Sequence, residues 1–242
     1  MMAVLAMFAL TGALSVALQS LGERIRSLGV HRMGGIYWYI VAPGVACHET
    51  GHALGCLITG TKVFKFVPFY PQGNTLGYVQ HEARGGWRGS ICDVIISTGP
   101  IWFGALMIAF IGKLLMSPNA MSMLGVMDCG SGFADAIFRW LGAVFELFFA
   151  LISGSLFAGW KTIVGGYLIF CIASEMGMSW VDAMHMRRGL MVLVIALVVM
   201  TLMPICGFIM IKMLPFFVCL NAIMALALLV GMLVHGVVIV LR

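Results

Sequence analysis

The sequence has little charge of either sign. Charged residues make up only 10% of the 242 positions, hydrophobic residues make up 62%, and the mean hydropathy is +1.08. Several apolar runs approach the length of about 20 residues that crosses a bilayer. The net charge of +5 is spread over loops and forms no basic stripe with interleaved aromatics. We therefore expect an integral, multi-pass membrane protein in contact with the lipid bilayer, and no nucleic-acid partner.

Paired cysteine motifs are also missing. The seven cysteines form no Cys-x-x-Cys pair, and all but Cys129 lie in apolar segments. We interpret them as small buried hydrophobic residues, which carry no information about the redox compartment. Several of the twenty methionines surround His185, a grouping that could suggest Cu(I), but packing in the core and against lipid explains them more simply.

No internal repeat or low-complexity segment divides the chain, so we predict a single membrane domain over 1–242. The expected fold class is an all-α polytopic membrane protein. It has about six to seven transmembrane helices and a small interfacial β-hairpin or loop. We divide the domain into a first helix and loop (1–35), a core (36–190) and two C-terminal transmembrane helices (191–242).

Apolar runs set the approximate bounds of the expected helices: 2–19, 36–58, 91–116, 137–158, 162–178, 189–212 and 215–241. Residues 2–19 lack the basic start of a signal peptide, so we interpret them as a transmembrane helix that is kept. A short charged loop is expected after it, and the polar residues 179–188 should end or extend the fifth helix. Positive charge is similar on both sides of the second helix, so orientation stays open.

Residues 61–82 have the pattern of a β-hairpin. Two partly alternating runs flank the turn-forming segment 71–74. Pro68 argues that the first strand lies at an edge, and an exposed edge is where an extended peptide can add as a further strand. The alternative is a loop on the lipid headgroups, anchored by Phe64, Phe66, Phe69, Tyr70 and Tyr78.

Small residues predict close packing around the second helix. Gly51 and Gly55 form a small-xxx-small pair, so another helix should approach closely there. Gly99 and Pro100 predict a kink or break in the third helix.

The most informative segment is His48-Glu49-Thr50-Gly51-His52. Histidines at i and i+4 fall on one face of a helix about one turn apart, which suits a single Zn²⁺. Glu49 lies where its carboxylate can take a proton from a metal-bound water, as in zinc peptidases. Two core histidines and a buried Glu are the alternative, but uncompensated charge at membrane depth is expensive and by default functional. We predict His48 and His52 as zinc ligands and Glu49 as the general base.

A catalytic zinc usually has a third protein ligand. The residues alone leave this ligand open among His81, Asp93, Asp128, Asp135, Glu146, Glu175, Asp182, His185 and His235. Carboxylates in apolar helices need partners, because an unpaired charge there costs several kcal/mol. Glu146 could pair with Arg139, and His185 could support Asp182 or cap the helix at the interface.

The chain resembles the site-2-protease-type membrane zinc peptidases, in particular their bacterial B-class-like members. The resemblance rests on the segment 48–55 with Thr59-Gly60, a glycine-containing extended loop, a helix bearing Gly99-Pro100, and Ser179-Trp-Val-Asp182. It covers roughly residues 36–190. It implies that His48 and His52 are ligands, Glu49 is the general base and Asp182 is the third ligand.

The resemblance and the motif together suggest a zinc-dependent endopeptidase that acts within or at the surface of the membrane on membrane-associated proteins. A catalytically silent zinc-binding scaffold is the alternative, against which the intact Glu49 argues. A metal transporter would need further intramembrane ligands along a path. Specificity is expected from the helices, the 61–90 loop, a regulatory membrane partner or a second copy of the chain.

Overall fold

The computed structural model describes residues 2–71, 76–115, 159–201 and 204–240, with positions 138, 141, 142, 144, 145 and 149. It is mostly helical, with one small sheet of two strands. The elements run in the order α1 (Met2–Met33), α2 (Ile36–Thr59), β1 (Val63–Val67), β2 (Tyr78–His81), α3 (Gly86–Ser97), α4 (Gly99–Leu115), α7 (Trp160–Glu175), α8 (Trp180–Thr201) and α9 (Pro204–Val240). Most of the predicted helix 137–158, and the loop before it, lie outside the described residues.

Several predicted helix boundaries are wrong, including the end of the sixth helix, which lies at Thr201 rather than near residue 212. The first helix does not end near residue 19 but continues through its charged residues to Met33, and Gly34 follows with a left-handed φ of 57°. The polar residues 179–188 neither end nor extend the fifth helix, because a new helix, α8, begins among them. The last helix begins at Pro204 rather than near 215, since proline is favoured in a first helical turn.

The predicted kink in the third helix is confirmed as a full break. α3 ends at Ser97, α4 begins at Gly99, and Thr98 lies between them. The N–H of Ile101 donates to the Thr98 carbonyl at 3.0 Å, which closes the first turn of α4. Pro100 in that turn has no N–H to continue the hydrogen-bond pattern of α3.

Within the part of the chain that the structure describes, three helical segments are long and apolar enough to cross a membrane: Leu5–Met33, Gly86–Ile111 and Phe216–Leu233. The pair Ile163–Glu175 and Trp180–Arg187, bent by 51°, could make a fourth. α2 is not among them, because the polar residues of the histidine motif lower its mean hydropathy. The chain is thus compatible with a membrane protein, and the count of six to seven spans stays a prediction.

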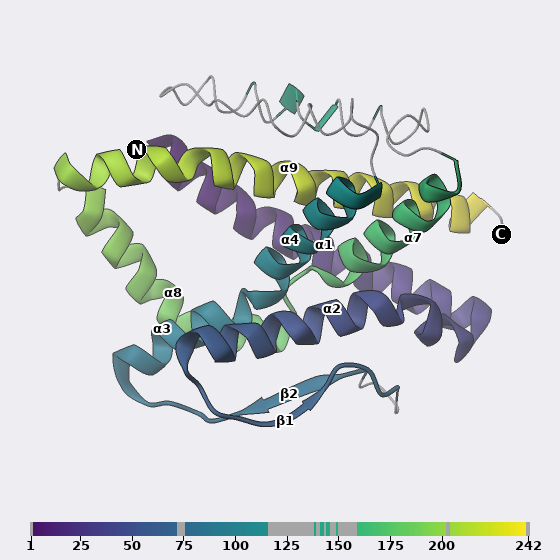
Figure 1. Cartoon of the computed structure of the whole chain (residues 1–242), viewed down its shortest axis with the longest axis horizontal. Coiled ribbons are helices and arrows are strands. Elements are labelled where there is room, and N and C mark those ends of the chain that lie inside the picture. The colour runs from purple at the N-terminus through teal and green to yellow at the C-terminus, as the bar shows by residue number, and fades with distance from the viewer. Residues whose placement is uncertain are drawn as a thin grey trace.

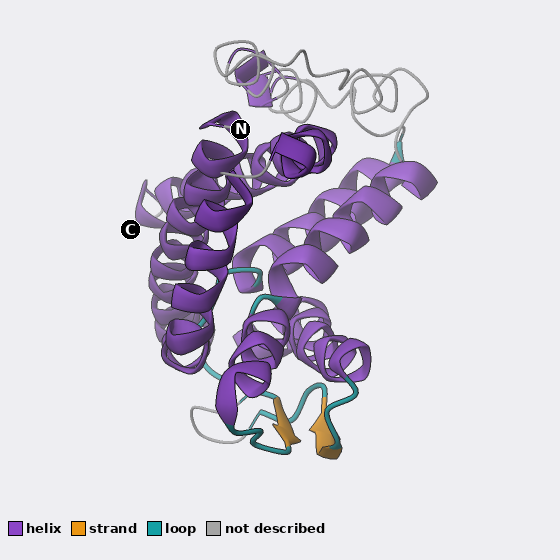
Figure 2. Cartoon of the chain, turned by 90° about the vertical axis from the view of Figure 1, so that its left-hand side faces the viewer, coloured by secondary structure: helices purple, strands orange, loops and turns teal. Residues whose placement is uncertain are grey.

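The helices form layers with the hairpin on the outside. α1 and α9 pack together on one side, α4 and α7 lie next to them, and α2 follows (Figure 1). The main hydrophobic core is built from α1, α4, α7 and α9. The two strands lie beyond α2, on the side away from α1 and α9 (Figures 1 and 2). α2 is therefore held between the helical core and the hairpin.

The predicted β-hairpin is confirmed, and it runs back along α2. Strands β1 and β2 pair antiparallel with Val67 opposite Tyr78, and an irregularity interrupts the register near Val63. At the hairpin base, Arg84 donates to the Thr59 carbonyl at 3.1 Å. Towards the hairpin turn, the ring of Phe69 contacts that of Tyr39 at 5.9 Å between centroids. Because 20 residues of helix span about 30 Å, the hairpin follows nearly the whole length of α2.

Candidate metal centre

The motif helix is in backbone contact with the break between α3 and α4. A Cβ added at Gly51 would lie 2.7 Å from the carbonyl carbon of Gly99, and one at Gly55 would lie 2.7 Å from the Cα of Ile96. No side chain fits in either place. The close approach predicted from the Gly51 and Gly55 pair is thus confirmed, and it brings the α3–α4 break next to both histidines.

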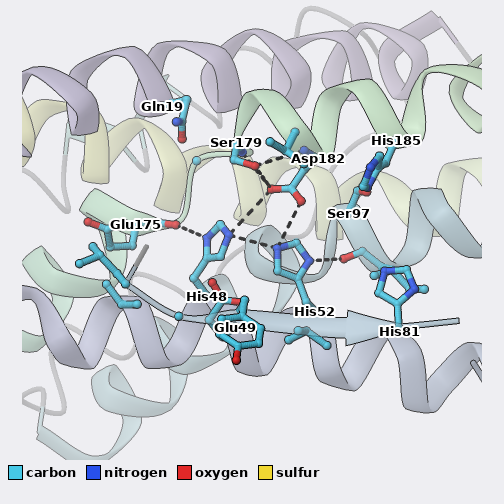
Figure 3. A pocket seen from close by; sticks show the side chains of 18 of the residues that line it. Gln19, His48, Glu49, His52, His81, Ser97, Glu175, Ser179, Asp182 and His185 are labelled. Atoms are coloured by element: carbon cyan, nitrogen blue, oxygen red, sulfur yellow. Dashed lines mark hydrogen bonds and ion pairs between the residues drawn. The ribbon is translucent and has the colours of Figure 1, made fainter. Parts of the chain in front are cut away.

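Both histidines are oriented by backbone carbonyls. His48 Nδ1 lies 2.6 Å from the Glu175 carbonyl, and His52 Nδ1 lies 2.8 Å from the Ile96 carbonyl (Figure 3). A carbonyl oxygen only accepts, so each Nδ1 must carry the proton. In the neutral imidazole this leaves Nε2 as the nitrogen with a free lone pair. The two Nε2 atoms face each other at 3.1 Å.

Asp182 completes the group from another helix. Its Oδ1 lies 3.4 Å from His52 Nε2, and its Oδ2 lies 3.9 Å from His48 Nε2. Oδ2 also accepts from the Ser179 N–H at 3.0 Å and from the Ser179 hydroxyl at 2.5 Å, while the Ser179 hydroxyl accepts from the Asp182 N–H at 3.1 Å. This reciprocal pattern is a capping box, with Ser179 as N-cap of α8. The cap therefore fixes Asp182 in the first turn with a carboxylate oxygen towards the histidines.

The group has the chemistry of a metal site. One atom from each of His48, His52 and Asp182 can be chosen so that all three lie within 4.8 Å of one another, and the three could hold a metal ion. Two imidazole lone pairs aimed at each other repel unless a cation or proton lies between them. Two nitrogens and a carboxylate oxygen suit Zn²⁺ and leave a fourth position open, as in catalytic zinc sites.

A cavity of about 450 Å³ contains this group. Glu49 lines it next to the histidines, below them in Figure 3. Strand β2 and the residues before it form part of the cavity wall, and Gly77 approaches Glu49 so closely that an added Cβ would lie 2.8 Å from Glu49 Cγ. The polar groups and the peptide backbone thus border one space.

Known proteins provide no identification. The chain matches no protein-family model, no curated protein and no solved structure. A function must therefore be inferred from the site itself.

The other candidate third ligands among the described residues do not join the group. Glu175 forms an ion pair with Arg26 of α1, with Oε2 2.5 Å from Nη2, so it has the partner that a buried carboxylate needs. His81 and His185 line the same cavity. Asp93 and His235 lie outside the histidine–aspartate group, and Asp128, Asp135 and Glu146 fall outside the described residues.

Sequence reasoning missed the capping role of Ser179, the two carbonyls that orient the histidines, and the position of Arg26. Ser179 could have been found, since Ser-x-x-Asp before an apolar run is a capping-box signature. The carbonyls of Ile96 and Glu175 carry no sequence signal, because every residue has a carbonyl and only the fold decides which one is free. Arg26 was expected in a loop, whereas it lies in α1 against Glu175.

Proposed function

We propose that this protein is a zinc-dependent membrane endopeptidase that cleaves membrane-associated protein substrates. The observation that carries the proposal is the convergence of His48, His52 and Asp182 in a cavity that also contains Glu49. Zinc binding alone does not require Glu49. Hydrolysis requires a general base in addition to the metal ligands, and Glu49 lies next to the first ligand, His48.

In this proposal, different residues bind the metal and transfer the proton. Zinc, when bound, lowers the pKa of a coordinated water towards about 7 and polarises a carbonyl. His48, His52 and Asp182 would hold the ion within the cavity. A carboxylate oxygen of Glu49 accepts the proton of the attacking water and later delivers it to the leaving amine nitrogen.

The site lies at membrane depth in this proposal. Thr98, at the break next to Gly51, is near the middle of the Gly86–Ile111 candidate span. Asp182 likewise follows the bend between Ile163–Glu175 and Trp180–Arg187. Non-helical backbone at this depth is tolerated where it is buried in protein or lines a water-filled cavity. With the remaining apolar segments, we propose six to seven transmembrane helices around the site.

The hairpin supplies a docking edge for an unwound substrate. Gly77, Tyr78 and Val79 are consecutive, yet all three line the cavity. Side chains alternate along a strand, so the backbone edge of β2, and not only one face, borders this space. The sheet has two strands among the described residues, and β2 pairs with β1 through its other edge. An extended peptide can hydrogen-bond to the free edge and pass Glu49.

The test compares wild type with Glu49→Gln in membranes of cells producing either protein. Labelling of new N-termini should reveal membrane-protein fragments that are present with wild type and absent with the variant. Purified Glu49→Gln should still contain one zinc per chain. The same fragments in both membranes would contradict the proposal.

Two outcomes would favour other functions. Zinc in both proteins with no difference in fragments supports the catalytically silent scaffold. Zinc movement across proteoliposomes that is unaffected by Glu49→Gln supports a transporter. Absence of zinc from the wild type after reconstitution removes the metal site itself.

A further inference from the structure

The α3–α4 break leaves the backbone carbonyl of Ile96 without its usual helical partner. In a continuous helix the Ile96 carbonyl would accept from the N–H of residue 100, four positions later. Residue 100 is a proline, which has no N–H. The Pro100 side chain is fully buried, and the carbonyl of Ile96 lies 2.8 Å from His52 Nδ1.

We infer that Pro100 is a positioning residue for His52, acting through the Ile96 carbonyl. By removing the competing N–H, it reserves that carbonyl for the imidazole and so fixes the tautomer whose Nε2 faces His48 and Asp182. The inference rests on the metal site within the proposed function and does not depend on peptide cleavage.

Sterics reinforce the missing hydrogen bond. A proline ring clashes with the carbonyl four residues earlier when the helix continues, and so prevents α3 and α4 from joining. The N–H of Thr98 is directed towards two carbonyls, those of Ile96 and Val94, and it lies 2.9 Å from the Val94 oxygen. The Ile96 carbonyl is therefore turned out of the helix towards α2, where Gly51 and Gly99 bring the two backbones into contact.

His48 is oriented in a similar way by a backbone carbonyl, but no proline is involved. The Glu175 carbonyl would be paired with the N–H of residue 179 if α7 continued. That N–H instead donates to Asp182 Oδ2 at 3.0 Å, and the carbonyl accepts from His48 at 2.6 Å. Each imidazole thus uses a carbonyl released at the end of a helix, and Pro100 is the residue that enforces the release for His52.

The experiment compares Pro100→Ala with Pro43→Ala, both in detergent-purified full-length protein. Pro43 also lies inside a helix, α2, so its replacement makes the same chemical change in the motif helix itself. The carbonyl it would engage belongs to Tyr39, which contacts neither histidine in the hydrogen bonds described. Loss of an orienting partner typically weakens metal binding 10–100-fold. We expect zinc affinity to fall by about that factor in Pro100→Ala, with an altered Co²⁺ d–d spectrum, and to change less than about threefold in Pro43→Ala.

A direct measurement on metal-free wild type covers the case in which Pro100→Ala does not fold. Nitrogen-15 NMR of histidine-labelled protein reports which ring nitrogen carries the proton. The His52 signals are assigned as those that disappear in the His52→Ala variant. We expect Nδ1 in the wild type and a mixture in Pro100→Ala. An Nε2-protonated His52 in wild type, or equal zinc affinity in folded Pro100→Ala and Pro43→Ala, overturns the inference. A wild type that binds no zinc but has Nδ1-protonated His52 overturns the proposed function alone.

Discussion

The two carboxylate oxygens of Asp182 have different tasks. Oδ2 is held by the N–H and hydroxyl of Ser179, while Oδ1 is the oxygen closest to His52. The residue is thus part of a helix cap and a candidate ligand at once. Its orientation depends on a serine that itself lies further from the histidines.

Removing that serine hydroxyl should affect both stability and metal binding. In Ser179→Ala we expect a loss of about 1 kcal/mol in unfolding free energy from the weakened cap, and 10–100-fold weaker zinc binding. Ser179→Thr keeps the hydroxyl and should restore most of the zinc affinity. Thermal unfolding in detergent and zinc titration measure the two effects, and equal zinc affinity in Ser179→Ala and wild type would contradict the positioning role.

Asp182 and Glu175 should respond differently to neutralisation. Asp182→Asn removes the charge facing the histidines and should abolish stoichiometric zinc binding. Glu175→Gln leaves Arg26 with a neutral partner, so we expect zinc to be retained and stability to fall by about 1–3 kcal/mol, less than for a fully buried pair because Arg26 is 33% exposed. Elemental analysis and unfolding of both variants check this. Loss of zinc in Glu175→Gln with retention of zinc in Asp182→Asn would show that Glu175, and not Asp182, is the third ligand.

At the scale of residues, the sequence predicts the candidate metal ligands better than the groups that orient them. His48 and His52 fall together because a helix dictates their spacing. Asp182 was reached through a resemblance, and its proximity to the histidines depends on how α8 packs against α3. The carbonyls that orient the imidazoles could not be predicted, because their release depends on where two helices end.

At the scale of elements, the breaks matter more than the helices. α3 and α4 part at Thr98, and α7 and α8 part between Glu175 and Trp180. Both breaks lie beside the motif of α2. The continuous helices α1 and α9 pack mainly with each other and contribute to the core.

Close contact at the first break makes Gly51 sensitive to any side chain. In Gly51→Ala the new Cβ would lie 2.7 Å from backbone atoms of Gly99 and Pro100, so α2 and α4 must separate. We expect a loss of about 1–3 kcal/mol and weaker zinc binding. Gly12→Ala in α1 meets no atom within 4 Å and serves as the control, with unchanged zinc binding. Unfolding and zinc titration of both variants provide the comparison, and matching behaviour would argue against a packed contact.

The hairpin offers a separate test of substrate handling. In Gly77→Ala the Cβ would meet Glu49 Cγ at 2.8 Å and the carbonyl of Pro68 at 2.9 Å. We expect cleavage of substrates found with wild type to fall at least tenfold, because Glu49 or the β2 edge is displaced, while zinc content stays at one per chain. Full cleavage in Gly77→Ala would show that this approach is not needed.

Sequence patterns located most elements but misjudged how they join. The motif helix and the hairpin were predicted, since apolar runs and turn residues mark them directly. The charged end of α1 was taken for a loop because its partner, Glu175, lies 149 residues away. An ion pair between residues so far apart in the sequence cannot be detected from the local hydrophobic periodicity.

For the whole molecule, the cavity should be wet while the outer helix faces are covered by lipid. Val181 and Leu106 are matched in exposure, at 60% and 59%, but only Val181 lines the cavity. In a variant without its native cysteines, Val181→Cys should react with a water-soluble thiol reagent in intact membranes. Leu106→Cys, within the Gly86–Ile111 span, should stay unlabelled. Mass spectrometry of the labelled protein decides, and equal labelling would argue against burial of that span in lipid.

The position of Asp182 in the chain has a consequence for folding. His48 and His52 are neighbours even in a denatured chain, whereas Asp182 is far from them along the sequence and near only after α8 has packed. A metal ion bound at this group would therefore act as a reversible cross-link that closes a very long loop, and it would bind the folded chain far more tightly than the unfolded one. Chelation should consequently lower the melting temperature, and zinc added during refolding should raise the yield of native protein.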